Sequence, residues 1–388
     1  KNMAAQAFTP REMIDRLVAF DTTSRESNLG LIHFIRDYLA GHGVESTLIH
    51  DGSGKKANLF ATVGPMVDGG VVLSGHTDVV PVDGQDWTHA PFQVTEADGR
   101  LYGRGTADMK SFSAIALALV PEMVARGLNL PIHFALSYDE EVGCLGAPDL
   151  SRHLQGLPVR PQALIVGEPT EMKVVNAHKG CCAIRTTVTG LEGHSSETHK
   201  GVNSIFAAAK LINYLAERAE EMQTTNVNPR FDPPYTTIQV GTINGGTAGN
   251  IIPKETTFWW EYRTCPGVNG AEIVADFEAF AQAKVLPKMR AVHPEADIRI
   301  EVRGEVIPLL PEEGSPAETL VLALTGSNQT HAVSYGTEAG IFQKGGVASV
   351  ICGPGSISVA HKPDEYIEVS QVEACEDLMH KLIDRLAS

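Results

Sequence analysis

The chain has 388 residues, a length that favours two domains over a single hydrophobic core. Hydrophobic residues make up 43% of it and charged residues 20%, a composition typical of globular proteins. The formal net charge of −16 argues against nucleic acid or an anionic membrane as a partner, and no apolar run approaches the roughly 20 residues of a membrane-spanning helix.

Up to about residue 180, helical and strand-like segments alternate. Thr9, Pro10 and Glu12 form the pattern of a helix start, with a threonine cap, proline in the first turn and glutamate three residues after the cap. Further helices and strands are expected here at residues 29–39, 71–73, 115–124, 132–137 and 164–166. Strands separated by helices predict an α/β domain with a largely parallel, buried sheet.

Beyond residue 180 the pattern changes to strand, helix, strand, strand, helix, strand. These elements are expected at residues 183–191, 203–222, 236–243, 256–263, 271–285 and 298–302. Their order predicts a small α+β sandwich with one solvated sheet face. After Pro308 and Pro311 the α/β pattern resumes, with a strand at 347–351 and a closing helix at 371–386. The sequence thus predicts one discontinuous domain, residues 1–180 and 305–388, around an inserted domain at 181–304.

The cysteines and the start of the chain indicate the cellular compartment. The six cysteines show no CxxC spacing, and in a chain of this length they are typical of reduced thiols. The first residues lack the basic-then-apolar pattern of a secretory signal. We therefore expect a cytoplasmic protein.

The sharpest local signal is the apolar run at 71–73 that leads into His76 and Asp78. At the strand ends of an α/β sheet, side chains project into the crevice where ligands bind. His76 is thus a candidate metal ligand, with Asp78 accepting from its other ring nitrogen and fixing the ring orientation. An isolated pair of this kind more often only satisfies a loop, so its meaning depends on further ligands.

Further ligand-type residues follow in similar positions. Asp108 comes after a glycine-rich loop, Glu140 and Glu141 after the strand at 132–137, and Glu168 after the strand at 164–166. His361 supplies a second loop histidine near the C-terminus. Two histidines and several carboxylates form a mixed set of nitrogen and oxygen ligands, which zinc or cobalt-like ions accept.

The adjacent acids Glu140 and Glu141 admit two interpretations. On a solvated surface such a pair often has no function. At the end of an apolar strand, however, like charges cost free energy unless cations compensate them. One acid would then bind metal, while the other would act as general base on a water whose pKa a metal lowers towards about 7.

Taken in order, these segments resemble the M20 metallopeptidase family over essentially the whole chain. The resemblance implies a zinc-peptidase-like catalytic domain with a mostly parallel sheet, split around an inserted lid domain that forms a homodimer. It implies two divalent metal ions, with zinc the leading candidate and cobalt the alternative. His76 and Glu168 would hold the first ion and Glu141 and His361 the second, with Asp108 bridging both.

The same resemblance assigns roles around the metals. Glu140 would be the general base, and Asp78 would orient His76. The peptide bond between Asp108 and Met109 would be cis. In the lid, His194 would cross the dimer to stabilise the oxyanion. Asn250 would donate to the substrate and Arg263 would clamp its α-carboxylate, although each of these lid residues taken alone is more typical of a structural role.

Within the family, two segments favour one substrate class. Residues 108–112 and 335–339 resemble the acetylornithine deacetylases more than the succinyl-diaminopimelate desuccinylases. Glu338 would meet the δ-ammonium of ornithine, and Thr337 would donate to the substrate carboxylate. The expected reaction is hydrolysis of N2-acetyl-L-ornithine to acetate and L-ornithine, in arginine biosynthesis. The alternatives are a desuccinylase, a broader N-acyl amino acid amidohydrolase, a dipeptidase, or a metal-dependent binding protein without catalysis.

Overall fold

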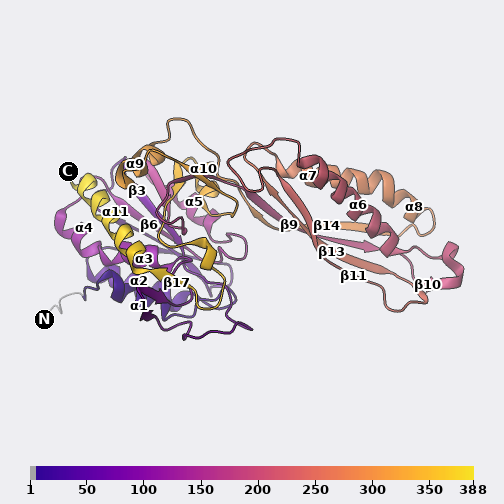
Figure 1. Cartoon of the computed structure of the whole chain (residues 1–388), viewed down its shortest axis with the longest axis horizontal. Helices are drawn as coiled ribbons and strands as arrows, with labels where there is room; N and C mark the ends of the chain where they lie inside the picture. The colour runs from indigo at the N-terminus through magenta and orange to yellow at the C-terminus, as the bar shows by residue number, and fades with distance from the viewer. Residues whose placement is uncertain (1–5) are drawn as a thin grey trace. The chain divides into compact units, whose positions relative to one another are not determined.

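The computed structural model describes residues 6–388, which divide into two compact units (Figure 1). The first unit comprises the chain up to Ala177, Leu309–Ala332 and Thr337–Ser388, and the second comprises His178–Pro308 and Val333–Gly336. The predicted insertion at 181–304 falls inside the second unit. Part of the start that lacks a signal pattern lies outside the described residues. Among residues 6–388, no helix is both long and apolar enough to cross a membrane.

The first unit is built on an eight-stranded sheet. In order across the sheet, its strands are β1 (Ser46–His50), β2 (Ala57–Val63), β6 (Ile132–Ser137), β3 (Val71–His76), β7 (Ala163–Val166), β16 (Ser349–Ile351), β8 (Val175–His178) and β15 (His331–Val333). The central strands β6, β3, β7 and β16 run parallel to one another, whereas β1, β2 and β8 pair antiparallel with their neighbours. The prediction of a mostly parallel sheet is confirmed for this centre.

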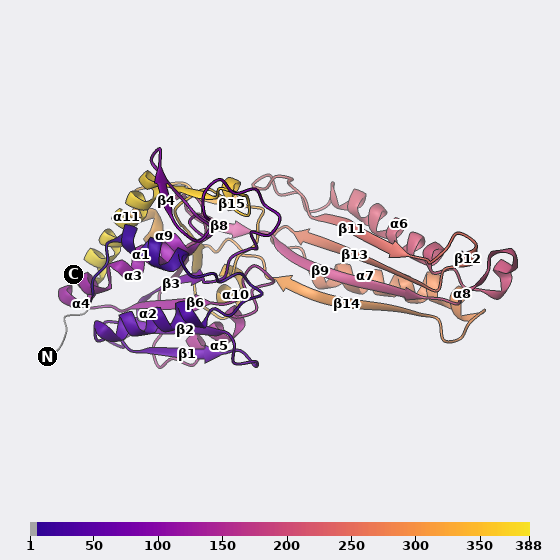
Figure 2. The same ribbon diagram turned by 90° about the horizontal axis from the view of Figure 1, so that it is seen from below.

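Helices cover both faces of this sheet (Figures 1 and 2). They are α1 (Pro10–Val18), α2 (Leu29–Gly41), α3 (Lys110–Ala118), α4 (Val120–Arg126), α5 (Ala147–Gln155), α9 (Pro316–Thr325), α10 (Ala339–Lys344) and α11 (Val369–Ala387). Val71 and Leu73 pack with α1, α3 and α11 in one hydrophobic core. Val72 points to the opposite face, because side chains alternate along a strand, and on that face α5 and α10 contact the sheet. The central strands are therefore buried on both sides.

The predicted helix start at Thr9 is confirmed as a capping box. The Thr9 hydroxyl accepts from the Glu12 amide at 3.2 Å, and the Glu12 carboxylate accepts from the Thr9 amide at 2.8 Å. Two of the amides that a helix start leaves without partners are thereby satisfied.

The single helix predicted at 115–124 is wrong, because two helices, α3 and α4, meet at Leu119. Pro121 has no N–H, so it cannot bond the carbonyl of Leu117 as an unbroken helix would require. The Tyr38 hydroxyl instead donates to that carbonyl at 2.8 Å. The break is thus set by one proline and stabilised by a side chain from α2.

We expect His133 to make the protein sensitive to acid. His133 lies on β6, and burial lowers its pKa from 6.5 to about 4. The folded state therefore keeps this ring neutral while the unfolded chain binds a proton, so stability is lost as the pH falls from 6.5 towards 4. In His133→Gln, the free energy of unfolding should fall less steeply than in the wild-type chain over this range. The difference between the two slopes should reach up to ~1.4 kcal/mol per pH unit. Denaturant unfolding at several pH values measures this slope. The exposed His50→Gln is the control, and equal slopes for both variants would contradict the prediction.

The second unit has the predicted element order. Its main elements are β9 (Gly180–Thr189), α6 (Ser204–Met222), β11 (Thr237–Gly245), β13 (Glu255–Thr264), α7 (Gly270–Phe280) and β14 (Asp297–Val306). The strands form an antiparallel sheet in the order β11-β13-β9-β14. α6 and α7 lie on one face of this sheet, where Leu211, Phe258 and Phe277 belong to one core (Figure 1). The predicted sandwich with one open sheet face is thus present.

One helix of this unit differs from its prediction. The helix expected at 271–285 ends at Phe280, and a π-helical turn (Ala281–Val285) leads into α8 (Leu286–Arg290). Pro287 lies in the first turn of α8 and cannot continue the regular pattern of helical hydrogen bonds. The remaining short elements are β4 (Thr95–Ala97), β5 (Arg100–Tyr102), β10 (Gly193–His194), β12 (Ile251–Ile252), β17 (Tyr366–Glu368) and the 3₁₀ turns η1 (Ser195–Lys200) and η3 (Ile357–Val359).

Candidate metal centre

The candidate metal centre lies at the carboxyl ends of neighbouring strands in the first unit. His76 ends β3, the Glu140–Glu141 pair follows β6, and Glu168 follows β7. Because β3 lies between β6 and β7 and runs parallel to both, these ends meet at one edge of the sheet. A side chain at Gly167 would put its Cβ 1.9 Å from the Phe112 ring, so glycine is required where β7 leads into Glu168.

Two loops supply the remaining ligand-type residues. Asp108 follows the glycine-rich loop and stands just before α3, and the Asp108–Met109 peptide bond is cis, as the resemblance implied. His361 follows η3, and its backbone has a left-handed conformation with φ of 64°.

A first group of ligand atoms surrounds His76. Its Nε2 lies 3.0 Å from Asp108 Oδ1 and 3.3 Å from Glu168 Oε1. All three residues are buried, and their ligand atoms lie within 4.8 Å of one another. One nitrogen and two carboxylate oxygens are ligands that zinc accepts.

A second group surrounds His361. Its Nε2 lies 3.1 Å from Asp108 Oδ2 and 3.1 Å from Glu141 Oε2. Asp108 thus turns one carboxylate oxygen towards each histidine, the arrangement that a bridging ligand requires. His76, Glu140 and Glu141 also lie within the range that could hold a metal ion. The residues at the edge of this sheet therefore fit two neighbouring cations.

The pKa values indicate an excess of buried negative charge. Burial and, after it, the charge of Asp108 raise the pKa of Glu141 to about 8 and that of Glu168 to about 7. Burial also raises the pKa of Glu140 well above its usual value. Burial opposes ionisation of Asp108 too, but hydrogen bonds from His361 and His76 outweigh it and lower its pKa. Carboxyl groups held together in this way favour bound cations.

Asp78 was expected to accept from the second ring nitrogen of His76, and its contacts differ from this expectation. The His76 Nδ1 lies 2.9 Å from the Asp78 backbone carbonyl and 3.5 Å from its carboxylate. The carboxylate instead accepts from the amides of Glu140 and Glu141, at 3.0 and 3.2 Å, and from the Ser24 hydroxyl at 2.6 Å. Asp78 thus orients the histidine through its backbone and the two glutamates through its side chain.

Asp78→Ala is therefore expected to lower activity by about 10–100-fold, the usual effect of losing a residue that orients metal ligands. The loss should fall mainly on kcat, because the amides of Glu140 and Glu141 lose their acceptor. Ser24→Ala removes only one donor to the same carboxylate and serves as the milder comparison. Steady-state kinetics of both variants measure the difference, and equal effects would contradict it.

Glu338 and Thr337 lie next to the centre within the same unit. Glu338 is 1% exposed, and one of its carboxylate oxygens accepts from the Ser137 hydroxyl, while Oε2 has no hydrogen-bond partner among the described residues. Burial raises the pKa of Glu338 to about 7, and its charge in turn raises the pKa values of Glu140 and Glu168. The Thr337 hydroxyl oxygen accepts from the Ala339 amide at 3.0 Å. Their contacts with substrate stay predictions.

Comparison with known proteins gives the same assignment. The model of peptidase family M20/M25/M40 matches residues 72–385. The chain belongs to this family. An acetylornithine deacetylase of Pasteurella multocida is 33% identical, with 97% of this chain and 98% of that protein covered. One of Myxococcus xanthus is 36% identical, with 96% of each covered. The resemblance seen in the sequence is thereby confirmed.

The fold is also that of the M20 family. A family M20 metallo-carboxypeptidase from Sulfolobus solfataricus superposes with a TM-score of 0.77 at 18% identity, covering 97% of this chain and 99% of that one. An aminopeptidase from Bacillus cereus gives a TM-score of 0.74 at 20% identity, with 98% of both chains covered. The α/β fold class predicted from the sequence is therefore confirmed.

Three other predicted site residues of this M20 chain lie in the second unit. His194 is on β10, and the next residue, Ser195, donates from its amide to the Asn250 carbonyl at 3.1 Å. The His194 Nδ1 accepts from the Ser196 amide at 3.1 Å. Arg263 is on β13, with its Nε 3.2 Å from Glu261 Oε1. The structure brings His194 and Asn250 into neighbouring segments, and the roles of all three towards substrate stay predictions.

Several residues around the centre were missed by sequence reasoning. Ser24 contacts Asp78, and Glu365 accepts from the Asp108 amide at 2.9 Å. Arg104 is 1% exposed and contacts Glu365. The sequence offered one signal for Arg104, because it stands between two glycines in the loop that leads to Asp108. Nothing in the sequence indicated that its partner is Glu365.

Proposed function

We propose that this chain is a metal-dependent amidohydrolase that cleaves N2-acetyl-L-ornithine to acetate and L-ornithine, in arginine biosynthesis. The observation that carries the proposal is the metal centre at the sheet edge, with a further carboxylate, Glu140, only 10% exposed, beside its ligand-type residues. The curated relatives named acetylornithine deacetylase, 33% and 36% identical over nearly the whole chain, support this substrate.

Two divalent metal ions would occupy the centre, zinc by preference and cobalt as the alternative. The first would be held by His76 and Glu168 and the second by Glu141 and His361, with Asp108 shared. The mixed nitrogen and oxygen ligands suit both metals. When bound, such ions polarise the carbonyl of the substrate and make water more acidic.

Glu140 would move the proton in this reaction. Its Oε2 lies 3.8 Å from His76 Nε2, so the carboxylate stands beside the ligands, and the Asp78 side chain holds its backbone amide. As general base, Glu140 takes the proton of the attacking water. The same carboxyl can then pass this proton to the leaving amine.

Residues of the inserted domain would complete substrate recognition, as the resemblance implies. We propose that His194 stabilises the oxyanion across a homodimer, that Asn250 donates to the substrate, and that Arg263 binds its α-carboxylate. Glu338 would meet the δ-ammonium of ornithine, with Thr337 as a donor to the carboxylate. A buried acid suits a cationic substrate group and disfavours a succinyl carboxylate.

Initial rates of amine release test the proposal. Acetylornithine and succinyl-diaminopimelate are compared side by side with protein reconstituted with zinc or cobalt. Fast release from acetylornithine alone is the expected result. Preference for the succinyl compound would keep the metal centre but reject the roles of residues 335–339. Release from neither would direct the search to the wider aminoacylases and dipeptidases of the family.

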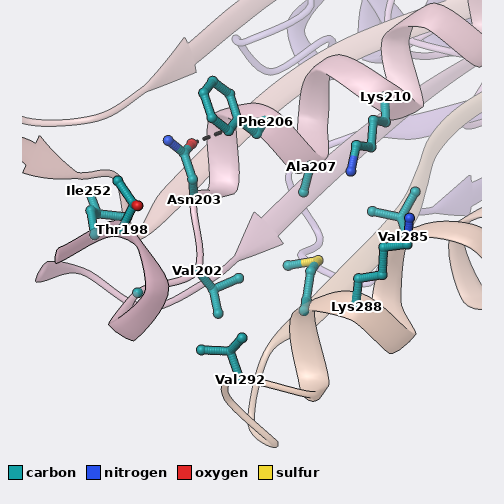
Figure 3. Close-up of a pocket in the computed structure, with 12 residues that line it drawn as sticks. Thr198, Val202, Asn203, Phe206, Ala207, Lys210, Ile252, Val285, Lys288 and Val292 are labelled. Carbon is teal, nitrogen blue, oxygen red and sulfur yellow. Dashed lines mark hydrogen bonds between the residues drawn. The ribbon is translucent and has the colours of Figure 1, made fainter. Parts of the chain in front are cut away.

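The proposed homodimer would form through the inserted domain. Exposed apolar side chains gather at the start of α6 and on neighbouring strands, with Phe206 69% and Ile251 39% exposed. Phe206 and Asn203 both line a pocket of about 250 Å³, and the Phe206 amide donates to the Asn203 side chain at 3.0 Å (Figure 3). None of the predicted site residues lines this pocket. Phe206→Asp should convert dimers to monomers in analytical ultracentrifugation. A dimer that persists would place the interface elsewhere.

We also propose a cytoplasmic location. All six cysteines lie in the described part of the chain and are unpaired, and five of them are buried. Unpaired thiols in these numbers suit a reducing compartment. Fractionation of cells that express the tagged chain tests this directly.

A further inference from the structure

Two of the proposed metal ligands lack the support of a sheet. His76 ends a central strand, whereas Asp108 and His361 stand on loops that are far apart in the sequence. The separation between their ligand atoms is nevertheless small, with Asp108 Oδ2 3.1 Å from His361 Nε2. His361 also has a left-handed backbone, which non-glycine residues rarely adopt. Something must hold these two loops against each other.

Glu365 holds the loop of Asp108. Its side chain is 1% exposed, and its Oε1 accepts from the backbone amides of Ala107 and Asp108 at 3.0 and 2.9 Å. Its own amide carbonyl accepts from the Gly103 amide at 2.9 Å. Glu365 lies four residues after His361, so the segment that carries one ligand is bonded directly to the backbone of the other.

Arg104 and Gln85 hold the loop of His361. The Arg104 Nη1 donates to Glu365 Oε2 at 2.8 Å and to the Lys362 carbonyl at 3.1 Å, and its Nη2 donates to the Gln85 side-chain oxygen. The Gln85 Nε2 donates to the His361 carbonyl at 2.7 Å. The carbonyls of His361 and of the next residue are thus both held by side chains.

Stability alone does not account for this arrangement. Arg104 and Glu365 are each 1% exposed, and removing two charges from water opposes folding unless their pairing compensates it. Apolar residues of similar volume often stabilise the folded protein as well as, or better than, a buried ion pair. The charges here have an additional consequence, because their hydrogen bonds end on the backbone of both ligand-bearing loops.

We propose that Arg104, Glu365 and Gln85 form a positioning network that sets the separation of Asp108 and His361, and thereby the affinity of the centre for its second metal ion. The three residues act through the backbone of the ligands and are not ligands themselves. This inference rests on the two-metal centre proposed above. A network of this kind, acting behind the ligands, is expected to change metal affinity by about 10–100-fold.

Cobalt titration of the metal-free protein, followed by calorimetry and visible absorption, tests the network. The wild-type chain should bind two ions per chain. Gln85→Leu should weaken one binding step by about 10–100-fold and leave the other, because it frees the His361 carbonyl while Glu365 keeps its bonds to the Asp108 loop. Glu365→Gln should also weaken binding, since an amide cannot accept from two backbone amides and Arg104 together. Glu373→Gln, an exposed acid on α11, is the matched control.

A double variant separates positioning from simple burial of charge. Arg104→Met/Glu365→Leu removes both buried charges, so its unfolding temperature should recover relative to Glu365→Gln, while its metal affinity should stay low. Recovery of metal affinity together with stability would overturn the inference, as would wild-type affinity in both single variants. Fewer than two ions bound by the wild-type chain would instead count against the two-metal proposal.

Discussion

Glu140→Ala is expected to lower kcat by about 10²–10⁴-fold, the usual contribution of a general base. The side chain is 10% exposed, and its Oε2 lies 3.8 Å from His76 Nε2, beside the ligands where the attacking water would be held. The substitution leaves His76, Asp108 and Glu168 in place, so the first ion should still bind. Steady-state rates, with metal content determined on the same sample, measure the effect.

Two comparisons make this result specific. Glu140→Gln keeps the volume of the side chain but cannot take a proton, so it should be impaired to a similar extent. Glu171→Gln changes an exposed acid beyond Glu168 and should keep normal turnover. Near-normal turnover in Glu140→Ala would contradict its role as general base, whereas loss of both metal ions would indicate that Glu140 is a metal ligand.

Asp108→Asn is expected to reduce activity to background and to release both metal ions. Asp108 is the residue whose two oxygens face both histidines, at 3.0 Å from His76 and 3.1 Å from His361. An amide keeps the shape but loses the charge and one of the two oxygens, so it can no longer be shared by both ions, and its remaining oxygen is a weaker, neutral ligand. His361→Ala, by contrast, removes a ligand of only one ion.

Elemental analysis after dialysis distinguishes these two variants. We expect close to no metal in Asp108→Asn and about one ion per chain in His361→Ala. Asp377→Asn, an exposed acid on α11, controls for the loss of charge. Retention of two ions by Asp108→Asn would show that this carboxylate does not bridge them.

Local sequence signals predicted many of the elements. Residues 132–137 are predicted as a strand because they form a short, mainly apolar run between helical segments, and β6 spans the same residues. The errors arose at Pro121 and Pro287, where a helical pattern of apolar residues continues across a proline that interrupts the hydrogen bonding. Apolar periodicity reports burial, and burial continues across such a break.

The metal centre was predictable for a related reason. His76, Glu140 and Glu168 each follow an apolar strand, and neighbouring parallel strands bring such ends together. Glu365 and Gln85 follow no such rule, because their partners are backbone groups in loops distant in sequence. Asp78 illustrates the same limit: its position was predicted, but the amides that its carboxylate accepts from were not.

The order of strands in the first unit has a consequence for synthesis of the chain. β16 pairs with β7 at the centre of the sheet, although the whole of His178–Pro308 lies between them in the sequence. A ribosome therefore produces β7 with one open edge, and then a continuous insertion, before the strand that covers this edge emerges. His361 is made later still, so we expect the second metal ion to be held only after the segment that carries His361 has left the ribosome. Until then, the open edge of β7 can pair with other chains, and we expect a chaperone to protect it.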